Sequence, residues 1–92
     1  MEEFQLVEKT LTITNKSGLH ARPAALLVKE AGRHTCQVTL RKGDKEVDAK
    51  SILGVMSLAV AAGDAVTIRT DGPDEAEALA AVVQLLESGL GE

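Results

Sequence analysis

One histidine lies where three features that favour phosphate chemistry meet. His20 follows a turn that contains Gly18 and precedes Arg22 and Pro23. An imidazole can serve as a nitrogen nucleophile at neutral pH. Pro23 fits the first turn of a helix, where backbone N–H groups have no intrahelical partner. The amides of Ala21 and Arg22 and the Arg22 guanidinium would then suit a phosphoryl group on His20. A capping histidine beside a solvent-facing arginine is the simpler interpretation of the spacing alone.

Ser51 is the second candidate for phosphate chemistry. It precedes the apolar run Ile52 to Leu58 and is a candidate helix N-cap. A phosphate there would interact favourably with the helix dipole and add about −1.5 to −2 charges. A plain capping role is the simpler interpretation of the serine on composition alone. Ile52, Leu53 and Met56 cannot all point inward from so short a helix, which predicts an exposed docking patch, with core filling as the alternative.

The remaining reactive side chains give weaker signals. His34 lies between a predicted helix and a predicted strand, and we interpret it as a surface-loop histidine and not a metal ligand. Cys36 alternates with Val38 and Leu40 and is interpreted as a buried, unreactive side chain. The sequence contains no nucleotide-binding loop, dinucleotide fingerprint or catalytic carboxylate pair. We therefore expect neither a cofactor nor a metal ion.

Length and composition limit the class of protein. The 92 residues allow one domain, 1–92, and the 45% hydrophobic and 26% charged composition is that of a folded chain. Phe4 is the only aromatic residue and the net charge is −4, which argues against nucleic-acid binding. The longest apolar stretch, Ile52 to Ala62, is too short to cross a bilayer, which needs about 20 residues. Because no stretch can cross a bilayer, we expect a soluble protein. Its single cysteine cannot form an internal disulfide, which favours the reducing cytoplasm. We also expect a monomer.

Charge is distributed unevenly along the chain. Residues 16–50 hold eight Lys and Arg against four acidic residues, whereas residues 51–92 hold one Arg against seven acidic residues. This asymmetry suggests a positive face for an acidic partner or a phosphate, although solvated charge without a function is the commoner explanation.

The spacing of apolar side chains predicts the elements that position these residues. Alternation predicts a strand over 6–14, a hairpin over 36–47 and a strand around 66–68. Helical spacing predicts helices over 21–31 and 52–58, and a third after Pro73. The third has the expected inner stripe Ala76, Leu79, Ala80, Val83 and Leu86.

The predicted element order defines the fold class. It is β-α-β-β-α-β-α, an α+β open-faced β-sandwich in which helices cover one face of a four-stranded antiparallel sheet.

Two segments, SGLHARPAA at 17–25 and KSILGVMSL at 50–58, resemble the histidine-containing phosphocarrier (HPr) family of the bacterial phosphoenolpyruvate-dependent sugar phosphotransferase system. The closing SGLGE is similar to the end of Gram-positive-type members, and the predicted element order agrees with the family fold. The resemblance implies a phosphoryl carrier and not an enzyme. Phosphorylated enzyme I would pass a phosphoryl group to Nδ1 of His20, and His20 would pass it to a sugar-specific enzyme IIA.

The resemblance also implies roles for the neighbouring residues. Arg22 would neutralise the phosphate, and Ser17 and the amides of Ala21 and Arg22 would bind its oxygens. Ser51 aligns with a regulatory serine that the HPr kinase/phosphorylase phosphorylates with ATP. The phosphoserine would slow phosphate entry from enzyme I and, in Gram-positive-type systems, bind the catabolite control regulator.

The resemblance further implies that Leu19, Ile52, Leu53 and Met56 contact partners, although Leu53 stands where many Gram-positive-type members have methionine. The alternative function is a purely regulatory interaction module that acts through Ser51 while His20 is an idle helix cap. A regulatory paralogue that lacks the histidine is disfavoured because His20 is present. The extension Met1 to Gln5 has no assigned role.

Overall fold

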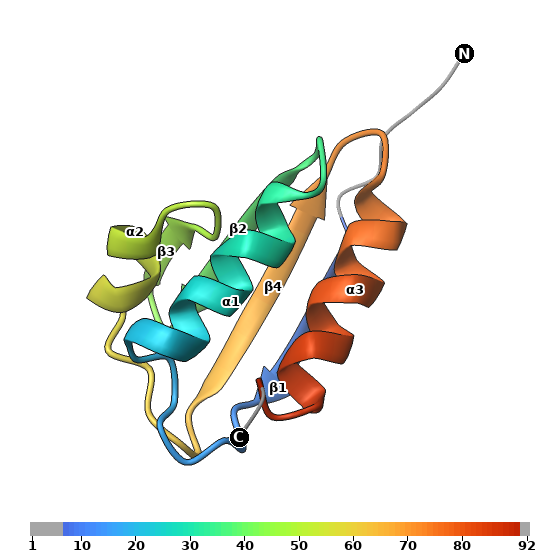
Figure 1. Ribbon diagram of the computed structural model, residues 1–92. Coiled ribbons are helices and arrows are strands. Elements are labelled where there is room, and N and C mark those ends of the chain that lie inside the picture. Colours follow the sequence, from blue (N-terminus) through green and yellow to red (C-terminus); the bar gives the residue numbers. More distant parts are fainter. Residues whose placement is uncertain (1–6, 91–92) are drawn as a thin grey trace.

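A computed structural model describes residues 7–90, in which four strands and three helices follow one another in the predicted order (Figure 1). Residue 6, where the first strand was predicted to begin, and the Met1 to Gln5 extension lie outside the described residues. The first strand ends at Thr12, two residues before the predicted end. The elements are β1 (Val7–Thr12), α1 (Ala21–Gly32), β2 (Gln37–Lys42), β3 (Lys45–Asp48), α2 (Ile52–Ser57), β4 (Ala65–Asp71) and α3 (Glu75–Glu87).

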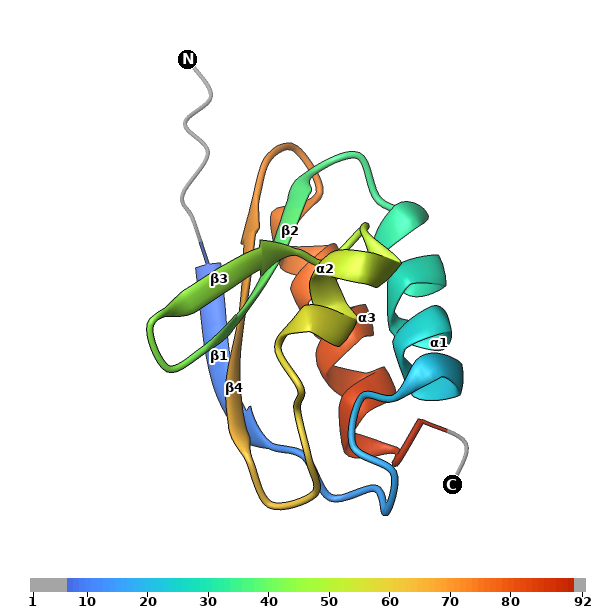
Figure 2. The ribbon, with the colours of Figure 1, turned by 90° about the vertical axis from the view of Figure 1, so that its left-hand side faces the viewer.

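The strands form one antiparallel sheet in the order β1-β4-β2-β3. The central strand β4 pairs with β1, where Leu11 lies opposite Val66, and with β2, where Leu40 lies opposite Ile68. Helices α1 and α3 lie side by side over one face of this sheet, and α2 lies beside β3 and α1 (Figures 1 and 2). No described element covers the other face, so the predicted open-faced sandwich is confirmed.

The core lies between the sheet and the two long helices. Strand alternation sends Val38, Leu40, Val66 and Ile68 toward the helices, and each has at most 1% of its surface exposed. Helical spacing brings one apolar side of α1 onto them. The buried side chains of this helix are Pro23, Ala24, Leu27 and Ala31.

The predicted inner stripe of α3 was partly wrong. Leu86 and Val83 are buried, but Ala76 and Ala80 are exposed. The buried row instead runs through Ala78, Val82 and Leu86, which are four residues apart. This alanine-rich helix has apolar residues on more than one side, so helical spacing is compatible with two different buried faces. The packing against the sheet determines which of the two faces is buried.

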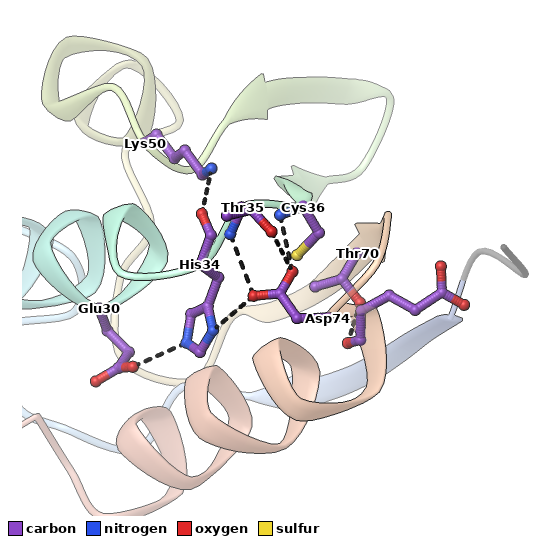
Figure 3. Close-up of polar contacts among 8 residues, drawn as sticks. Glu30, His34, Thr35, Cys36, Lys50, Thr70 and Asp74 are labelled. Carbon is purple, nitrogen blue, oxygen red and sulfur yellow. Dashed lines mark hydrogen bonds and ion pairs between the residues drawn. The ribbon is translucent and has the colours of Figure 1, made fainter.

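Asp74 joins the beginning of α3 to the beginning of β2. Its carboxylate accepts hydrogen bonds from the Thr35 amide at 3.1 Å, the Thr35 hydroxyl at 3.2 Å and the Cys36 amide at 2.9 Å (Figure 3). Partial burial acts to raise the pKa of Asp74, but the hydrogen bonds from Cys36 and Thr35 outweigh it and hold that pKa well below its ordinary value. The carboxylate is therefore ionised throughout the physiological pH range.

Cys36 is buried as predicted, with 2% of its surface exposed. Burial, together with the neighbouring Asp74 carboxylate, raises the pKa of its thiol to about 11. Since the thiolate is the reactive form, the folded protein holds this cysteine in an inert state at neutral pH.

Cys36 should therefore be protected from alkylation by folding. At about pH 8 we expect iodoacetamide to modify it at least about a hundredfold more slowly in the native protein than in the urea-unfolded chain. Mass spectrometry of timed samples measures both rates, and free cysteine in each buffer corrects for the effect of urea. Equal corrected rates in the two states would show that folding neither shields the thiol nor raises its pKa.

Candidate functional site

The loop between β1 and α1 is fastened to the loop between α2 and β4. The Leu19 amide donates to the Val60 carbonyl at 3.0 Å, and Ile13 exchanges backbone hydrogen bonds with Asp64 and Gly63 at 2.9 and 2.8 Å. These bonds hold the residue that follows Leu19, which is His20, in a fixed place at one end of the sheet.

Gly18 is required at the point where the two loops cross. Its φ is +61°, and a Cβ atom there would overlap the Val60 carbonyl and lie 2.8 Å from Cα of Ala61. The buried Asn15 side chain donates to the Gly18 carbonyl at 2.6 Å, which closes the turn.

Leu19 was predicted to contact partners, and the structure corrects this. Only 2% of Leu19 is exposed, because its side chain belongs to the hydrophobic core. Its burial anchors the end of the loop, and the next residue, His20, is exposed.

His20 is the N-cap of α1. Its backbone is extended, with φ −75° and ψ −172°, and its carbonyl accepts the first helical hydrogen bond from Ala24 at 2.8 Å. The imidazole makes no capping hydrogen bond, so it is not occupied in satisfying the helix end. The amides of Ala21 and Arg22 belong to the first turn and have no partner within the helix, and both residues are exposed. An exposed imidazole thus lies at the electropositive end of α1.

The charge around His20 is positive. The first turn of α1 contains no acidic residue, and among residues 7–90 no carboxylate forms an ion pair with Arg22. Ser17 is half-buried in the loop three residues before His20. The predicted phosphate-binding residues therefore lie within one short stretch of chain around the helix start.

Ser51 is the N-cap of α2, as predicted. Its backbone is extended, and its hydroxyl accepts a hydrogen bond from the Gly54 amide at 3.1 Å. The side chain is half-buried. The preceding residue, Lys50, donates from Nζ to the His34 carbonyl at 2.7 Å, which ties this end of α2 to the loop after α1.

An exposed apolar patch covers the outer side of α2. Leu53 has 79% of its surface exposed, Met56 41% and Ile52 39%, whereas Val55 is fully buried. The predicted exposure of these three side chains is confirmed, while their role in docking stays a prediction; Val55 and Leu58 are the residues of this segment that fill the core. Leu26 on α1, which packs against α2, is also 37% exposed and was missed. It could have been found, because helical spacing places it away from the buried side of α1, which contains Ala24, Leu27 and Ala31.

Several residues of the basic region have structural partners. Lys42 donates to the carbonyls of Leu58 and Ala59 at 3.4 and 3.1 Å, and Lys45 donates to Ser57 at 3.3 Å, so two cations lie at the C-terminal end of α2. The Ala61 amide and Lys42 lower the pKa of Asp64, which lies 2.9 Å from Lys42. Some of the positive charge in residues 16–50 therefore stabilises the fold and is not available to a partner.

His34 was interpreted as a surface-loop histidine, and the structure corrects this. Its side chain is 10% exposed and lies between the carboxylates of Glu30 and Asp74. Within the described part of the chain, no group of three or more His, Cys, Asp or Glu residues is placed to hold a metal ion. In residues 7–90, no helix has the length and apolar character needed to span a membrane.

The chain is similar to HPr and HPr-like proteins over almost its whole length. Residues 7–88 match the family described as "PTS HPr component phosphorylation site". Phosphocarrier protein HPr of Cupriavidus necator is 47% identical over 95% of this chain and 98% of its own. The HPr-like protein Crh of Halalkalibacterium halodurans is 48% identical over 89% of this chain and 98% of its own.

The fold gives the same result. The crystal structure of HPr-C-His from Thermoanaerobacter tengcongensis superposes with a TM-score of 0.91 at 50% identity, covering 94% of this chain and 97% of that one. Sequence and topology agree, and the chain belongs to the HPr family of phosphocarrier proteins of the phosphotransferase system.

Proposed function

We propose that His20 is the residue that carries the phosphoryl group, taking it from phosphorylated enzyme I and donating it to a sugar-specific enzyme IIA. The main support is the exposed imidazole, which makes no capping contact at the helix start that it caps. A side chain used only as an N-cap would accept hydrogen bonds from the first turn. His20 leaves those amides available to a bound anion.

The transfer is a substitution at phosphorus. The lone pair of the unprotonated His20 nitrogen, Nδ1 by family resemblance, forms the new N–P bond, while the bond from phosphorus to the donor breaks and its electrons leave with the donor. Arg22 and the amides of Ala21 and Arg22 stabilise the added negative charge. An exposed helix terminus contributes about 0.3 to 1 kcal/mol, which suits a group that must be released again.

The apolar patch on α2 provides the docking surface for the protein partners. Ile52, Leu53 and Met56 are exposed together on one short helix, and exposed apolar side chains at this density are typical of protein interfaces. Leu26 is a further exposed apolar side chain, and it lies on α1, the helix that packs against α2. Enzyme I and enzyme IIA would each contact this patch while they reach His20.

We also propose a cytoplasmic location. The single cysteine is buried and free, which suits a reducing cytoplasm.

Ser51 is proposed as the regulatory phosphorylation site for the HPr kinase/phosphorylase. Its hydroxyl lies at the helix start directly before Ile52 and Leu53. A phosphate on it would place about −1.5 to −2 charges beside the apolar patch. This charge would slow the exchange with enzyme I and offer the catabolite control regulator a feature that the unmodified protein lacks.

A purely regulatory interaction module remains the second candidate. HPr and the HPr-like protein Crh match this chain at similar identity, so overall likeness does not separate the two roles. Such a module would need Ser51 and the apolar patch but not a reactive His20. The local geometry at His20 favours the carrier.

Phosphoryl labelling distinguishes the two candidates. Incubation with radiolabelled phosphoenolpyruvate and enzyme I should give an acid-labile, base-stable phosphate on the protein. His20→Ala should abolish the label, and Ser51→Ala, the matched control, should retain it. Absence of label on the parent protein would favour the regulatory module.

Arg22→Ala tests the stabilisation of the phosphate. Loss of a charge-assisted hydrogen bond should slow transfer from enzyme I by about ten- to a hundredfold. Because Arg22 is an exposed first-turn residue, the free energy of unfolding should change by no more than about 0.5 kcal/mol. Rapid-quench transfer rates and urea unfolding measure the two effects. A variant that transfers at the parental rate would remove Arg22 from the mechanism.

Ser51→Asp tests the regulatory effect of charge. A carboxylate beside the docking patch should reduce the rate of transfer from enzyme I by about tenfold, chiefly through weaker association. Ser51→Asn keeps the size and capping ability of the side chain without its charge, and it should transfer at nearly the parental rate. Identical kinetics for the two variants would contradict the proposed regulation.

A further inference from the structure

The loop between α2 and β4, residues 58–64, supports the chain segment that carries His20. The Val60 carbonyl of this loop accepts a hydrogen bond from the Leu19 amide at 3.0 Å, and the loop backbone packs closely against Gly18. Figure 2 shows this yellow loop meeting the blue loop after β1 at one end of the sheet. A displacement of the Val60 carbonyl would therefore displace Leu19 and the histidine that follows it.

One residue of this loop has an unfavourable backbone conformation. Ala59 has a φ of +52°, in the left-handed region that residues with a Cβ atom seldom occupy. Its amide donates to the Met56 carbonyl at 3.1 Å, in the turn that follows α2. Such a conformation persists only where the surrounding contacts hold it. Because Val60 comes next in the chain, the direction of its carbonyl depends on this turn.

The contacts that hold the turn come from Lys42, the last residue of β2. Its ammonium group donates to the Ala59 carbonyl at 3.1 Å and to the Leu58 carbonyl at 3.4 Å, and it lies 2.9 Å from Oδ2 of Asp64. An ammonium group has three N–H donors, and these three oxygens match them. Two of the oxygens belong to the first residues of the loop and the third belongs to its last residue. Lys42 thus joins the two ends of the loop.

Asp64 connects this ion pair to the backbone on the far side of Val60. Its carboxylate accepts from the Ala61 amide at 2.8 Å, and its amide donates to the Ala61 carbonyl at 3.0 Å. The Ala61 amide and Lys42 lower the pKa of Asp64, so the carboxylate is ionised at neutral pH. The backbone is therefore held by Lys42 before Val60 and by Asp64 after it.

We propose that Lys42 is a positioning residue for phosphoryl transfer, because it holds loop 58–64 in the shape on which the place of His20 depends. The inference rests on the proposed function, in which His20 carries the phosphoryl group. Lys42 acts through Val60 and Leu19 and not through contact with the phosphate. A small displacement of the reacting nitrogen is enough to slow the transfer, because nitrogen and phosphorus must be aligned for the new bond to form.

Lys42→Met tests this role, since it keeps the length of the side chain and removes its donors and charge. At saturating acceptor we expect the rate of transfer from phosphorylated enzyme I to fall about five- to tenfold, with the half-saturating concentration within about twofold of the parental value. Rapid-quench measurements over a range of acceptor concentrations separate the two quantities. A parental rate in Lys42→Met would refute the proposal.

Lys45→Met is the matched control for the loss of charge. Lys45 lies on the same hairpin, and its ammonium contacts the Ser57 carbonyl at the end of α2, outside loop 58–64. This variant should transfer within about twofold of the parental rate. An equal loss of rate in Lys42→Met and Lys45→Met would show an effect of charge on docking and would overturn the positioning role.

Ala59→Gly provides a rescue that the positioning role predicts. Glycine adopts a positive φ without a steric penalty, so the turn then needs less support from Lys42. The double variant Lys42→Met/Ala59→Gly should recover at least about half of the parental rate, whereas Ala59→Gly alone should leave the rate unchanged. A double variant as slow as Lys42→Met would contradict the proposal.

Amide hydrogen exchange, followed by NMR, measures the support of the loop without enzyme I. In Lys42→Met the Leu19 amide should exchange at least about tenfold faster than in the parent, because its bond to Val60 opens more often. The Ala49 amide, which donates to the Val38 carbonyl at 2.9 Å, should keep its parental rate. Equal protection of Leu19 in the two proteins would refute the proposal.

Two further comparisons keep the test decisive. If Lys42→Met does not fold, Asp64→Asn replaces it in both measurements, because asparagine keeps an acceptor for the Ala61 amide and removes the ion pair with Lys42. The same losses of rate and of Leu19 protection are then expected, and their absence refutes the proposal. Failure of the carrier function would appear instead as absence of label on the parent protein, with the exchange of Leu19 unaffected.

Discussion

The contact between Gly18 and the Val60–Ala61 backbone is the constraint on which the site depends. A side chain at Gly18 would overlap that backbone, and the positive φ of Gly18 turns the chain so that Leu19 enters the core. The following residue must then face outward at the first turn of α1. The exposure of His20 is thus a consequence of the burial of its neighbour, and the site needs no pocket of its own.

Local sequence patterns were sufficient to predict most of the fold and the outline of the site. Alternation located the strands because one face of the sheet is buried and the other is open. On β2, for example, Val38 and Leu40 both lie on the buried face. The caps His20 and Ser51 were recognisable because capping depends on residues within one turn. The exposure on α2 followed from its short length, since Ile52, Leu53 and Met56 cannot all point inward from so short a helix.

The features that sequence reasoning missed depend on contacts between distant segments. Leu19 is adjacent to His20 in sequence, but its burial depends on the loop at Val60. Which face of α3 is buried depends on the sheet, because the alanines of this helix are compatible with two different buried faces. His34 is enclosed by Asp74, which is 40 residues away and whose position depends on hydrogen bonds to Thr35 and Cys36. Glu30, four residues before His34, was the one local signal.

The two ends of α1 show how a small protein can combine a reactive site with a stable fold. At its C-terminal end, His34 and Glu30 contact each other, and His34 also contacts Asp74 of the next helix. At its N-terminal end the first amides, the His20 ring and Arg22 are left without such contacts among residues 7–90. Groups that are already paired gain little from an added phosphate, whereas an unpaired electropositive end gains directly. Stabilising contacts at one end of the helix therefore allow the other end to remain unpaired, which a reversible phosphoryl carrier requires.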